Sequence, residues 1–383
     1  MSQEVAIVGI GYTSFRPLTP EVSYKELVYE AAVKAYEDAG LDPRSDVDSI
    51  VSVAEDFTEG TSIFDEYVPD QLGGMLKPNV TIPGDGIHGL ATAYMQIASG
   101  IVDVVAVEAH SKASNVLTLP RITAYAMDPV LNRPLRANPV FIAGMEMNRY
   151  LYTSGATREH CALVVAKNKR NALLNPAAAF GAALEPDQAL DSEMVAYPLS
   201  VVDISPHADG AIVVVLASAE VAQSLTDVPI WIRGIGWCND SPSLENRAWG
   251  RAIYAEEAGR MAYRTAGIRN AMDEIDLAEI DDAYSYKELQ HLEALGFCEY
   301  GRGGFLTADG VTEIEGALPV NASGGSIGGG HLLDASGLRA VVEVALQLRG
   351  EAGAHQIPGV ETGLAFGWRG VPSTSGAAVI LSS

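Results

Sequence analysis

Cysteine is scarce in this sequence. The 383 residues include three cysteines, an odd number that is too small for a disulfide-stabilised scaffold. We therefore expect Cys161, Cys238 and Cys298 to be small buried hydrophobic residues. The histidines do not show the spacing of metal ligands either, so no catalytic metal is predicted.

Basic residues are few as well. Lysine and arginine number 25 against 49 aspartates and glutamates, which gives a formal net charge of −24. Such a balance argues against nucleic-acid binding, which needs a basic surface, and against adhesion to anionic membranes. An anionic ligand can still bind, but only in a locally positive or dipolar pocket.

Long hydrophobic segments are also missing. No apolar run reaches the ~18 residues of a membrane span, and the first eleven residues carry no secretory signal. We therefore expect a soluble cytoplasmic protein. Hydrophobic residues nevertheless make up 48% of the chain, enough for a large core. At about 150 residues per domain, this length predicts two or three domains.

A strand and helix pattern near the start of the chain returns in its second part. Val5–Tyr12 has the composition of a buried strand running into a glycine turn, and Tyr24–Ala39 that of an amphipathic helix with Ser23 as its N-cap. Residues 231–237 and 255–266 repeat this order. The sequence therefore predicts an internal duplication.

The ends of the two halves match as well. Each half closes with a glycine-bounded helix and an apolar strand, at 89–100 and 211–218 and again at 337–350 and 375–382. We predict an N-terminal half over 1–225 and a C-terminal half over 228–383, both of α/β class with buried parallel strands. The first half is longer because of an insertion at about 110–195, and insertions of this length often form a lid or binding loop.

Two Gly-Ile-Gly sequences, at 9–11 and 234–236, do not indicate nucleotide binding. The dinucleotide-binding pattern requires a third glycine where this chain has Ser14. The second copy is explained by the duplication.

Four motifs carry a family resemblance. Residues 206–211 read Pro-His-Ala-Asp-Gly-Ala, 281–284 read Asp-Asp-Ala-Tyr, 319–325 read Pro-Val-Asn-Ala-Ser-Gly-Gly, and 330–337 open with Gly-His and end in Ala-Ser-Gly. In their order and spacing, over nearly the whole length, they resemble the thiolase superfamily, above all the lipid-transfer branch related to sterol carrier protein X. The resemblance implies two βαβαβαββ halves in a five-layer αβαβα arrangement with an inserted loop region.

The chain departs from this family at its catalytic positions. Thiolases attack with a cysteine in a Cys-x-Ser-Gly turn, and the corresponding residues here, 86–89, read Gly-Ile-His-Gly. No cysteine follows Cys298, so the second catalytic cysteine is missing too. Asp281 replaces the usual Asn or His, and Asp334 stands where the family has glycine. Because glycine cannot act as a nucleophile, these changes argue against covalent acyl transfer.

One reaction of an acyl-CoA thioester needs an enolate but no covalent nucleophile, namely retro-aldol cleavage of a β-hydroxyacyl-CoA. The chain resembles bacterial aldolases that lack the cysteines and cleave steroid side chains. They work with a DUF35-type partner of OB-fold and release a ketone or aldehyde with a short acyl-CoA. The resemblance implies a homodimer within a heterotetramer, and CoA present only as part of the substrate, without another cofactor.

The resemblance marks His331 and two tyrosines as catalytic candidates. His331 follows a glycine-rich stretch, where a ligand can approach closely, and is expected to bind the thioester oxygen. Tyr284 could donate to the β-hydroxyl or accept its proton through His331, and the ordinary tyrosine pKa of about 10 makes it a better acid than base. Tyr286 is a second candidate. The alternatives are a histidine with a structural role in its loop and aromatic residues of the core.

Two further catalytic candidates come from the same motifs. Asp281 and Asp282 point to opposite sides if they lie on a strand, so at most one faces the pocket, and its motif position favours Asp281. His88 is a candidate second donor, with a capping or packing role as the alternative. Asp85 and Asp334 are weaker candidates.

Substrate-binding candidates complete the predicted site. Lys167 and Arg170 have helical spacing and are candidates for neutralising the CoA phosphates, although such residues often form a solvated face. Ser326, Gly329 and Gly330 lie just before His331 and are expected to contact the ligand.

Two other functions remain open. A carrier of acyl-CoA or lipid, or a scaffolding subunit, could inherit the same fold, and so could an acyltransferase with another nucleophile. A carrier has no need of His331 and Tyr284, so their presence favours the aldolase. An acyltransferase would form an acylated enzyme that labelled acyl-CoA can trap.

Overall fold

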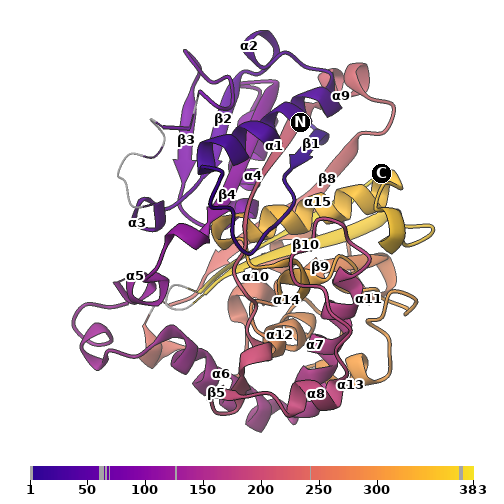
Figure 1. The fold of residues 1–383 in the computed structure, drawn as a ribbon. Helices are drawn as coiled ribbons and strands as arrows, with labels where there is room; N and C mark the ends of the chain where they lie inside the picture. Colours follow the sequence, from indigo (N-terminus) through magenta and orange to yellow (C-terminus); the bar gives the residue numbers. More distant parts are fainter. Residues whose placement is uncertain are drawn as a thin grey trace.

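The computed structural model describes residues 3–59, 64, 67–68, 70–125, 127–241, 243–370 and 374–383. Nine strands of this part of the chain form one sheet in the order β3-β2-β4-β7-β1-β8-β11-β10-β9 (Figure 1). Their bounds are β1 (Val5–Tyr12), β2 (Ser49–Val53), β3 (Asn79–Ile82), β4 (Val104–Lys112), β7 (Asp209–Ser218), β8 (Ile230–Asn239), β9 (Leu277–Ile280), β10 (Thr362–Arg369) and β11 (Ser375–Ser382). A separate pair consists of β5 (Met194–Ala196) and β6 (Leu199–Ser200).

The duplication predicted from the sequence has its counterpart in the strand order. The first half reads β2-β4-β7-β1 and the second half reads β9-β10-β11-β8, so equivalent strands take equivalent places. The two halves meet through a short antiparallel contact between β1 and β8, in which Ala6 pairs with Trp231 and Ile7 with Ile230.

The sheet is mixed, which corrects the expectation of parallel strands. Among the described strands, parallel pairing is confined to β2 with β3 and β4, and to β9 with β10. The strands β7, β1, β8 and β11 run antiparallel to their neighbours. For β10 and β11 the reason is simple: only five residues separate Arg369, the last residue of β10, from Ser375, the first residue of β11, too few for a parallel crossover.

The helices pack on both faces of this sheet. They are α1 (Tyr24–Ala39), α2 (Pro43–Asp46), α3 (Asp56–Glu59), α4 (Gly86–Ala98), α5 (Leu119–Tyr125), α6 (Pro139–Ser154), α7 (Arg158–Ala172), α8 (Pro186–Leu190), α9 (Ala219–Leu225), α10 (Ile253–Ala266), α11 (Ala271–Glu274), α12 (Ser285–Ala294), α13 (Gly303–Ala308), α14 (Gly325–Gly329) and α15 (Ser336–Arg349). Short 3₁₀ turns are η2 (Ala113–Asn115), η3 (Arg133–Leu135), η4 (Val201–Asp203), η5 (Leu244–Asn246), η6 (Leu333–Ala335) and η7 (Gly353–His355). Among the described helices, none is at once long enough and apolar enough to cross a membrane.

Three hydrophobic cores define the layers. The central core joins α4 and α15 to the facing sides of both sheet halves. A second core packs α1 on the outer side of the N-terminal half, and a third packs α10 and α12 on the outer side of the C-terminal half. Figure 1 shows α4 and α15 between the two halves. This arrangement confirms the expected α/β thiolase-type layering.

The helix α1 begins and ends at the residues that the sequence predicts. Ser23 and Glu26 form a reciprocal capping box at its start, and Gly40 ends it with a φ of +67°. The Gly-Ile-Gly sequences do not form turns but lie within β1 and β8. A Cβ at Gly11 would collide with the backbone of α1, and one at Gly234 with the backbone of α10. These glycines therefore allow each helix to pack closely on its strand.

The insertion predicted at 110–195 forms α5 to α8 along the lower side of the molecule in Figure 1. Its helix α7 packs against α12, α13 and α14 of the C-terminal half. The insertion thus covers the C-terminal half and supplies one wall of the pocket described next.

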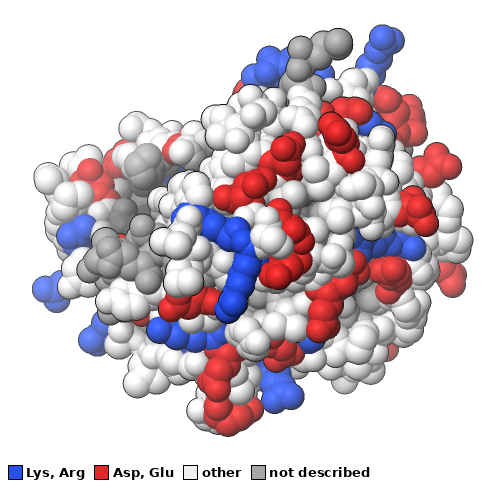
Figure 2. Space-filling model, turned by 90° about the horizontal axis from the view of Figure 1, so that it is seen from above, with Lys and Arg blue, Asp and Glu red and all other residues white. Residues whose placement is uncertain are grey.

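Acidic side chains spread over the surface of the molecule, with fewer basic ones between them, as Figure 2 shows for one face.

Candidate active site

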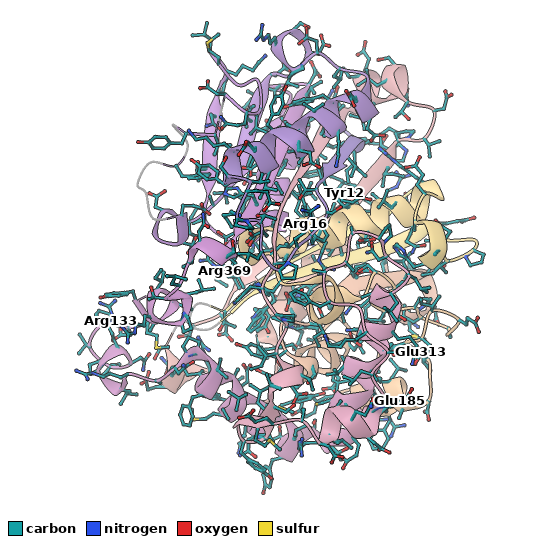
Figure 3. The ribbon with its side chains drawn as sticks, viewed as in Figure 1. Tyr12, Arg16, Arg133, Glu185, Glu313 and Arg369 are labelled. Carbon is teal, nitrogen blue, oxygen red and sulfur yellow. The ribbon has the colours of Figure 1, made fainter. Side chains whose placement is uncertain are left out.

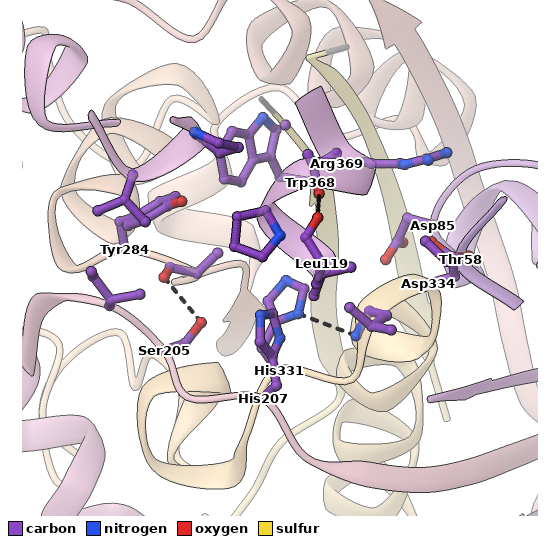
Figure 4. A pocket seen from close by; sticks show the side chains of 18 of the residues that line it. Thr58, Asp85, Leu119, Ser205, His207, Tyr284, His331, Asp334, Trp368 and Arg369 are labelled. Atoms are coloured by element: carbon purple, nitrogen blue, oxygen red, sulfur yellow. Dashed lines mark hydrogen bonds between the residues drawn. The ribbon is translucent and has the colours of Figure 1, made fainter. Parts of the chain in front are cut away.

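A pocket of about 210 Å³ opens between the insertion and the ends of the C-terminal strands (Figure 4). The insertion contributes residues of α5 and the start of α6, and the motif segments contribute Tyr284, His331 and Asp334. Trp368 and Arg369 close it at the end of β10. The volume is below the ~300–1,000 Å³ of most ligand pockets, so it suits the reacting end of a larger ligand.

The backbone around His331 fixes the orientation of its ring. Gly330 has a φ of +103°, and a Cβ there would lie 2.6 Å from the Cβ of Ala208. The His331 amide donates to the carbonyl of Pro206 at 2.8 Å, and the Ala208 amide donates to the His331 carbonyl at 3.0 Å. The glycine-rich stretch thus brings His331 against the segment that carries the Pro-His-Ala motif.

His331 faces the pocket as a neutral hydrogen-bond donor. Its Nδ1 accepts the amide hydrogen of Leu333 at 3.1 Å, so the proton of the neutral ring sits on Nε2. Burial lowers the pKa of His331 to about 3, aided by the nearby His207 and Arg339. The ring therefore offers an N–H and no basic lone pair to a ligand, which is the property required of an oxyanion donor.

Tyr284 supplies the second donor. It lies at the start of α12, on the opposite side of His331 from Asp334 in Figure 4. Burial raises the pKa of Tyr284 above its usual value, and the carboxylates of Glu146 and Asp281 add to this effect. The phenol consequently stays protonated, and its hydroxyl makes no hydrogen bond to the described residues. It is free to donate to a ligand.

Tyr286, the other predicted tyrosine, does not line the pocket. Its ring is fully buried and stacks on Tyr284 with 5.9 Å between ring centroids. Its hydroxyl donates to Oε2 of Glu146 on α6 at 3.0 Å. It therefore supports the ring of Tyr284 instead of contacting the ligand.

A buried lysine under the pocket was not anticipated from the sequence. The ammonium of Lys287 lies 4.4 Å from the ring centroid of Trp368, a pocket residue, and pairs with Glu146 at 2.7 Å. Gln290 accepts a further bond from it at 2.8 Å. Because a lysine within a polar helical segment is typical of a solvated face, the sequence contained no signal for this role. The pair ties the insertion to the floor of the pocket.

Neither aspartate of the Asp-Asp motif lines the pocket. The strand β9 ends at Ile280, so both lie beyond it, and the expected alternation along a strand does not apply. Asp282 accepts hydrogen bonds from the amide of Ile327 at 3.1 Å and from Asn168 at 2.8 Å. Asp281 accepts from the Ala283 amide at 3.0 Å, and burial raises its pKa to about 8. We assign both a structural role.

The predicted CoA-binding residues also lie away from the pocket. The ammonium of Lys167 is buried and held by Glu288 at 2.9 Å and by the Val320 carbonyl at 2.7 Å. Arg170 pairs at the surface with Glu313, which lies far from Arg369 in Figure 3. Lys167 and Arg170 lie on one helix, as their spacing predicts. The sequence could not show that the side chain of Lys167 lies on the buried face of α7.

The glycine and serine candidates before His331 are structural as well. Ser326 is fully buried, and its hydroxyl accepts from Arg339 at 3.1 Å. Gly329 and Gly330 take backbone bonds within the α14 region, where the Gly329 carbonyl accepts from Ala179 at 3.1 Å. They shape the turn that presents His331 and do not line the pocket themselves.

A carboxylate fills the space at the start of α4, where the nucleophile of a thiolase would be expected. Asp85 caps the helix through the Ile87 amide at 3.1 Å and accepts from the Gly337 amide at 2.7 Å. A Cβ at Gly337 or at Gly367 would collide with its carboxylate. Burial raises the pKa of Asp85. The ring of His88 accepts from the Asp85 amide at 3.3 Å, so the capping alternative describes its position.

Restoring a cysteine at residue 86 is expected to destabilise the protein without giving a nucleophile. A Cβ at Gly86 would lie 2.5 Å from the Cβ of Leu338, and such overpacking typically costs ~1–3 kcal/mol in the free energy of unfolding. Urea unfolding of Gly86→Cys and Gly86→Ala should show the same loss, and neither variant should be labelled by radioactive acyl-CoA. A stable, acylated Gly86→Cys variant would contradict this account.

A buried histidine holds the short helix α3, which carries the pocket residue Thr58, against β4. Nδ1 of His110 lies 2.7 Å from Glu108, and its Nε2 lies 3.3 Å from Glu59 of α3. Burial alone would lower the pKa of His110, but the two carboxylates outweigh it and raise the pKa well above its ordinary value. The ring also stacks on Tyr24 with 5.4 Å between centroids.

Replacing this histidine is expected to lower stability in a pH-dependent way. Because the pKa of His110 is higher in the folded protein, its contribution is fully present below about pH 6.5 and is lost as the pH rises through the folded pKa. His110→Gln leaves buried Glu108 without its cation, which typically costs ~3–5 kcal/mol. Urea unfolding between pH 6 and 10 should show the difference from the unchanged protein shrinking at alkaline pH, and a constant difference would contradict the assignment.

Comparisons with known proteins identify relatives of this chain. Residues 239–383 match the family "Thiolase C-terminal domain-like". The chain is 33% identical to an acetyl-CoA acetyltransferase of Methanothermobacter thermautotrophicus, over 97% of this chain and 98% of that protein. It is 29% identical to the 17-hydroxy-3-oxo-4-pregnene-20-carboxyl-CoA lyase of Mycobacterium tuberculosis, over 98% of both. A solved structure of an Ltp2-ChsH2(DUF35) aldolase matches with a TM-score of 0.85 and 27% identity, over 99% of this chain and 98% of that one.

Proposed function

The chain belongs to the thiolase superfamily, and we propose that it is a carbon–carbon lyase that cleaves a β-hydroxyacyl-CoA by a retro-aldol reaction. The products are a ketone or aldehyde and a shorter acyl-CoA. The observation that carries this proposal is a pocket with two neutral hydrogen-bond donors, His331 and Tyr284, next to a helix start that has glycine in place of a nucleophile.

The thioester oxygen accepts the Nε2 hydrogen of His331, and the phenol of Tyr284 donates to the same oxygen or to the β-hydroxyl. Loss of the hydroxyl proton makes the β-carbon a carbonyl, the bond between the α- and β-carbons breaks, and its electron pair moves into a thioester enolate. Neutral donors already in place stabilise that negative charge by several kcal/mol. Protonation of the α-carbon completes the cleavage.

We also propose the class of acyl group that the substrate carries. A steroid side-chain thioester, from a sterol or a bile acid, is supported by the similarity to a pregnene-carboxyl-CoA lyase and to an aldolase solved with a DUF35 protein. The name of the solved aldolase supports a DUF35 partner. From the family resemblance we further propose that this partner has an OB-fold and that the chain forms a homodimer within a heterotetramer. CoA enters as part of the substrate, without a separate cofactor.

Two alternatives make different demands on this site. A non-catalytic carrier or scaffold has no use for two convergent donors, but it would bind an acyl-CoA unchanged. An acyltransferase is favoured by the name of the methanogen relative, but it needs another nucleophile. The three free cysteines do not line the pocket, and burial raises the pKa of Cys161 and of Cys298.

The experiment is co-expression of the chain with a DUF35 protein, followed by incubation with a steroidal β-hydroxyacyl-CoA and mass detection of the products. A keto steroid or steroid aldehyde together with a short acyl-CoA is the expected result. Substrate that co-purifies unchanged would overturn the proposal in favour of a carrier, and an acylated enzyme trapped with labelled acyl-CoA would overturn it in favour of an acyltransferase.

A further inference from the structure

We infer that the carboxylate of Asp334 is the catalytic base that takes the β-hydroxyl proton. This inference rests on the proposed function and names the group that the reaction still requires. His331 and Tyr284 both enter the reaction as donors, because the His331 Nδ1 is already occupied by the Leu333 amide and Tyr284 stays a phenol. The proton acceptor must therefore be another residue of the pocket wall.

The position of Asp334 meets the requirements for that acceptor. It lies on η6, three residues after His331, and lines the same pocket (Figure 4). Its exposed fraction is only 8%, and its carboxylate makes no hydrogen bond to any described residue. Leu333, just before it, has a φ of +48°, a left-handed conformation that a non-glycine residue seldom adopts and that is often found at functional sites. The turn thus holds an unpartnered, buried carboxylate at the pocket surface.

Among the described residues of the wall, the other acceptors considered, Asp85 and His207, are already engaged. The carboxylate of Asp85 is occupied by the amides of Ile87 and Gly337. The ring of His207 bonds to the backbone of His331, and burial lowers its pKa, which makes it a weak base. Asp334 is therefore the acceptor that remains.

The charges around Asp334 suit a base that works near neutral pH. Burial raises the pKa of Asp334 to about 7. Arg369 on β10 opposes this shift, while Glu55, Glu59 of α3 and Asp85 add to it. Arg369 forms an ion pair with Glu55, so its charge is shared between two carboxylates. A carboxylate with this balance can both accept and return a proton in one catalytic cycle.

Asp334 alone can both accept the proton and return it, so the proton transfer needs no other acid or base. The Asp334 carboxylate takes the hydroxyl proton while the O–H electron pair forms the new carbonyl and the carbon–carbon pair passes to the enolate. The carboxylic acid then gives its proton to the α-carbon, which yields the shorter acyl-CoA and regenerates the carboxylate. No oxidant, reductant or second CoA is consumed.

The test compares unchanged protein with Asp334→Asn in the active complex with its partner. Cleavage of the steroidal β-hydroxyacyl-CoA by the unchanged protein establishes the proposed function independently of this inference. Asp334→Asn should then lose about 10²–10⁴-fold in kcat. In the unchanged protein, kcat should fall on the acid side with an apparent pKa near 7, and this limb should be absent from the residual activity of the variant.

Two further variants keep the test independent of folding defects. Asp334→Ala removes the carboxylate and leaves space, so added formate should restore part of its activity. Asp281→Asn is the matched buried control, because its carboxylate lies outside the pocket wall, and it should cost at least tenfold less in kcat than Asp334→Asn. Unchanged kcat and an unchanged acid limb in Asp334→Asn, or a failure of formate to restore Asp334→Ala, would overturn the inference.

Discussion

Replacement of His331 by alanine is expected to reduce kcat by about 10²–10³-fold, the usual cost of one oxyanion donor. The structure gives the reason: the ring is neutral and oriented by the Leu333 amide, and it presents its one N–H to the pocket. Its backbone bonds to Pro206 and Ala208 do not depend on the side chain, so the fold should survive. Steady-state cleavage assays, with urea unfolding as the check on folding, measure both effects.

A conservative variant separates the donor role from simple space filling. His331→Gln keeps an N–H of similar reach, so it should retain more activity than His331→Ala. The pH dependence of kcat should be the same in both variants as in the unchanged protein, because the pKa of His331 lies near 3 and the ring does not titrate in the working range. Equal activity of both variants and the unchanged protein would remove His331 from the site.

Tyr284→Phe is expected to cost at least about 10²-fold in kcat, the low end for loss of a positioned acid. The variant removes one hydroxyl that makes no hydrogen bond to the described protein, so the stability of the fold should change little. The stacking on Tyr286 and the contact with Trp368 are kept by phenylalanine. Turnover measured at saturating substrate reports the loss directly.

Tyr286→Phe is the matched control for this prediction. Its hydroxyl is buried and donates to Glu146, so its removal leaves a buried acceptor without that partner and should lower the free energy of unfolding by about 1–3 kcal/mol. Its effect on kcat should be at least tenfold smaller than that of Tyr284→Phe. The opposite order, with Tyr286→Phe more damaging to kcat, would show that the two tyrosines have been assigned the wrong roles.

Much of the fold could be predicted from local signals. The capping residues of α1, the alternation of strands and helices, and the repeat of both in the second half all have a local physical cause, and the structure places them where the pattern predicts. The direction of the strands, in contrast, could not be predicted from local signals. The direction of a strand depends on how the last strand of each half pairs with the others, which is a tertiary property. The expectation of parallel strands was therefore wrong for the centre of the sheet.

The candidate site was predictable where a motif fixes the backbone. The glycine-rich turn brings His331 into the pocket, and the start of α12 does the same for Tyr284. Helical spacing, however, does not say which face of α7 is buried, and so Lys167 was misplaced. The Lys287–Glu146 pair beneath Trp368 gave no signal, because a buried charge is indistinguishable in sequence from a solvated one until its partner is known.

We propose that this thiolase-type pocket cleaves a carbon–carbon bond without a covalent nucleophile. The most direct test is to incubate the co-expressed complex with a steroidal β-hydroxyacyl-CoA in D₂O, with no free CoA added, and to analyse the products by mass spectrometry. We expect equal amounts of the carbonyl product and the short acyl-CoA, with deuterium at the α-carbon of the acyl-CoA. Cleavage that requires free CoA, or that proceeds through an acylated enzyme, would contradict this proposal.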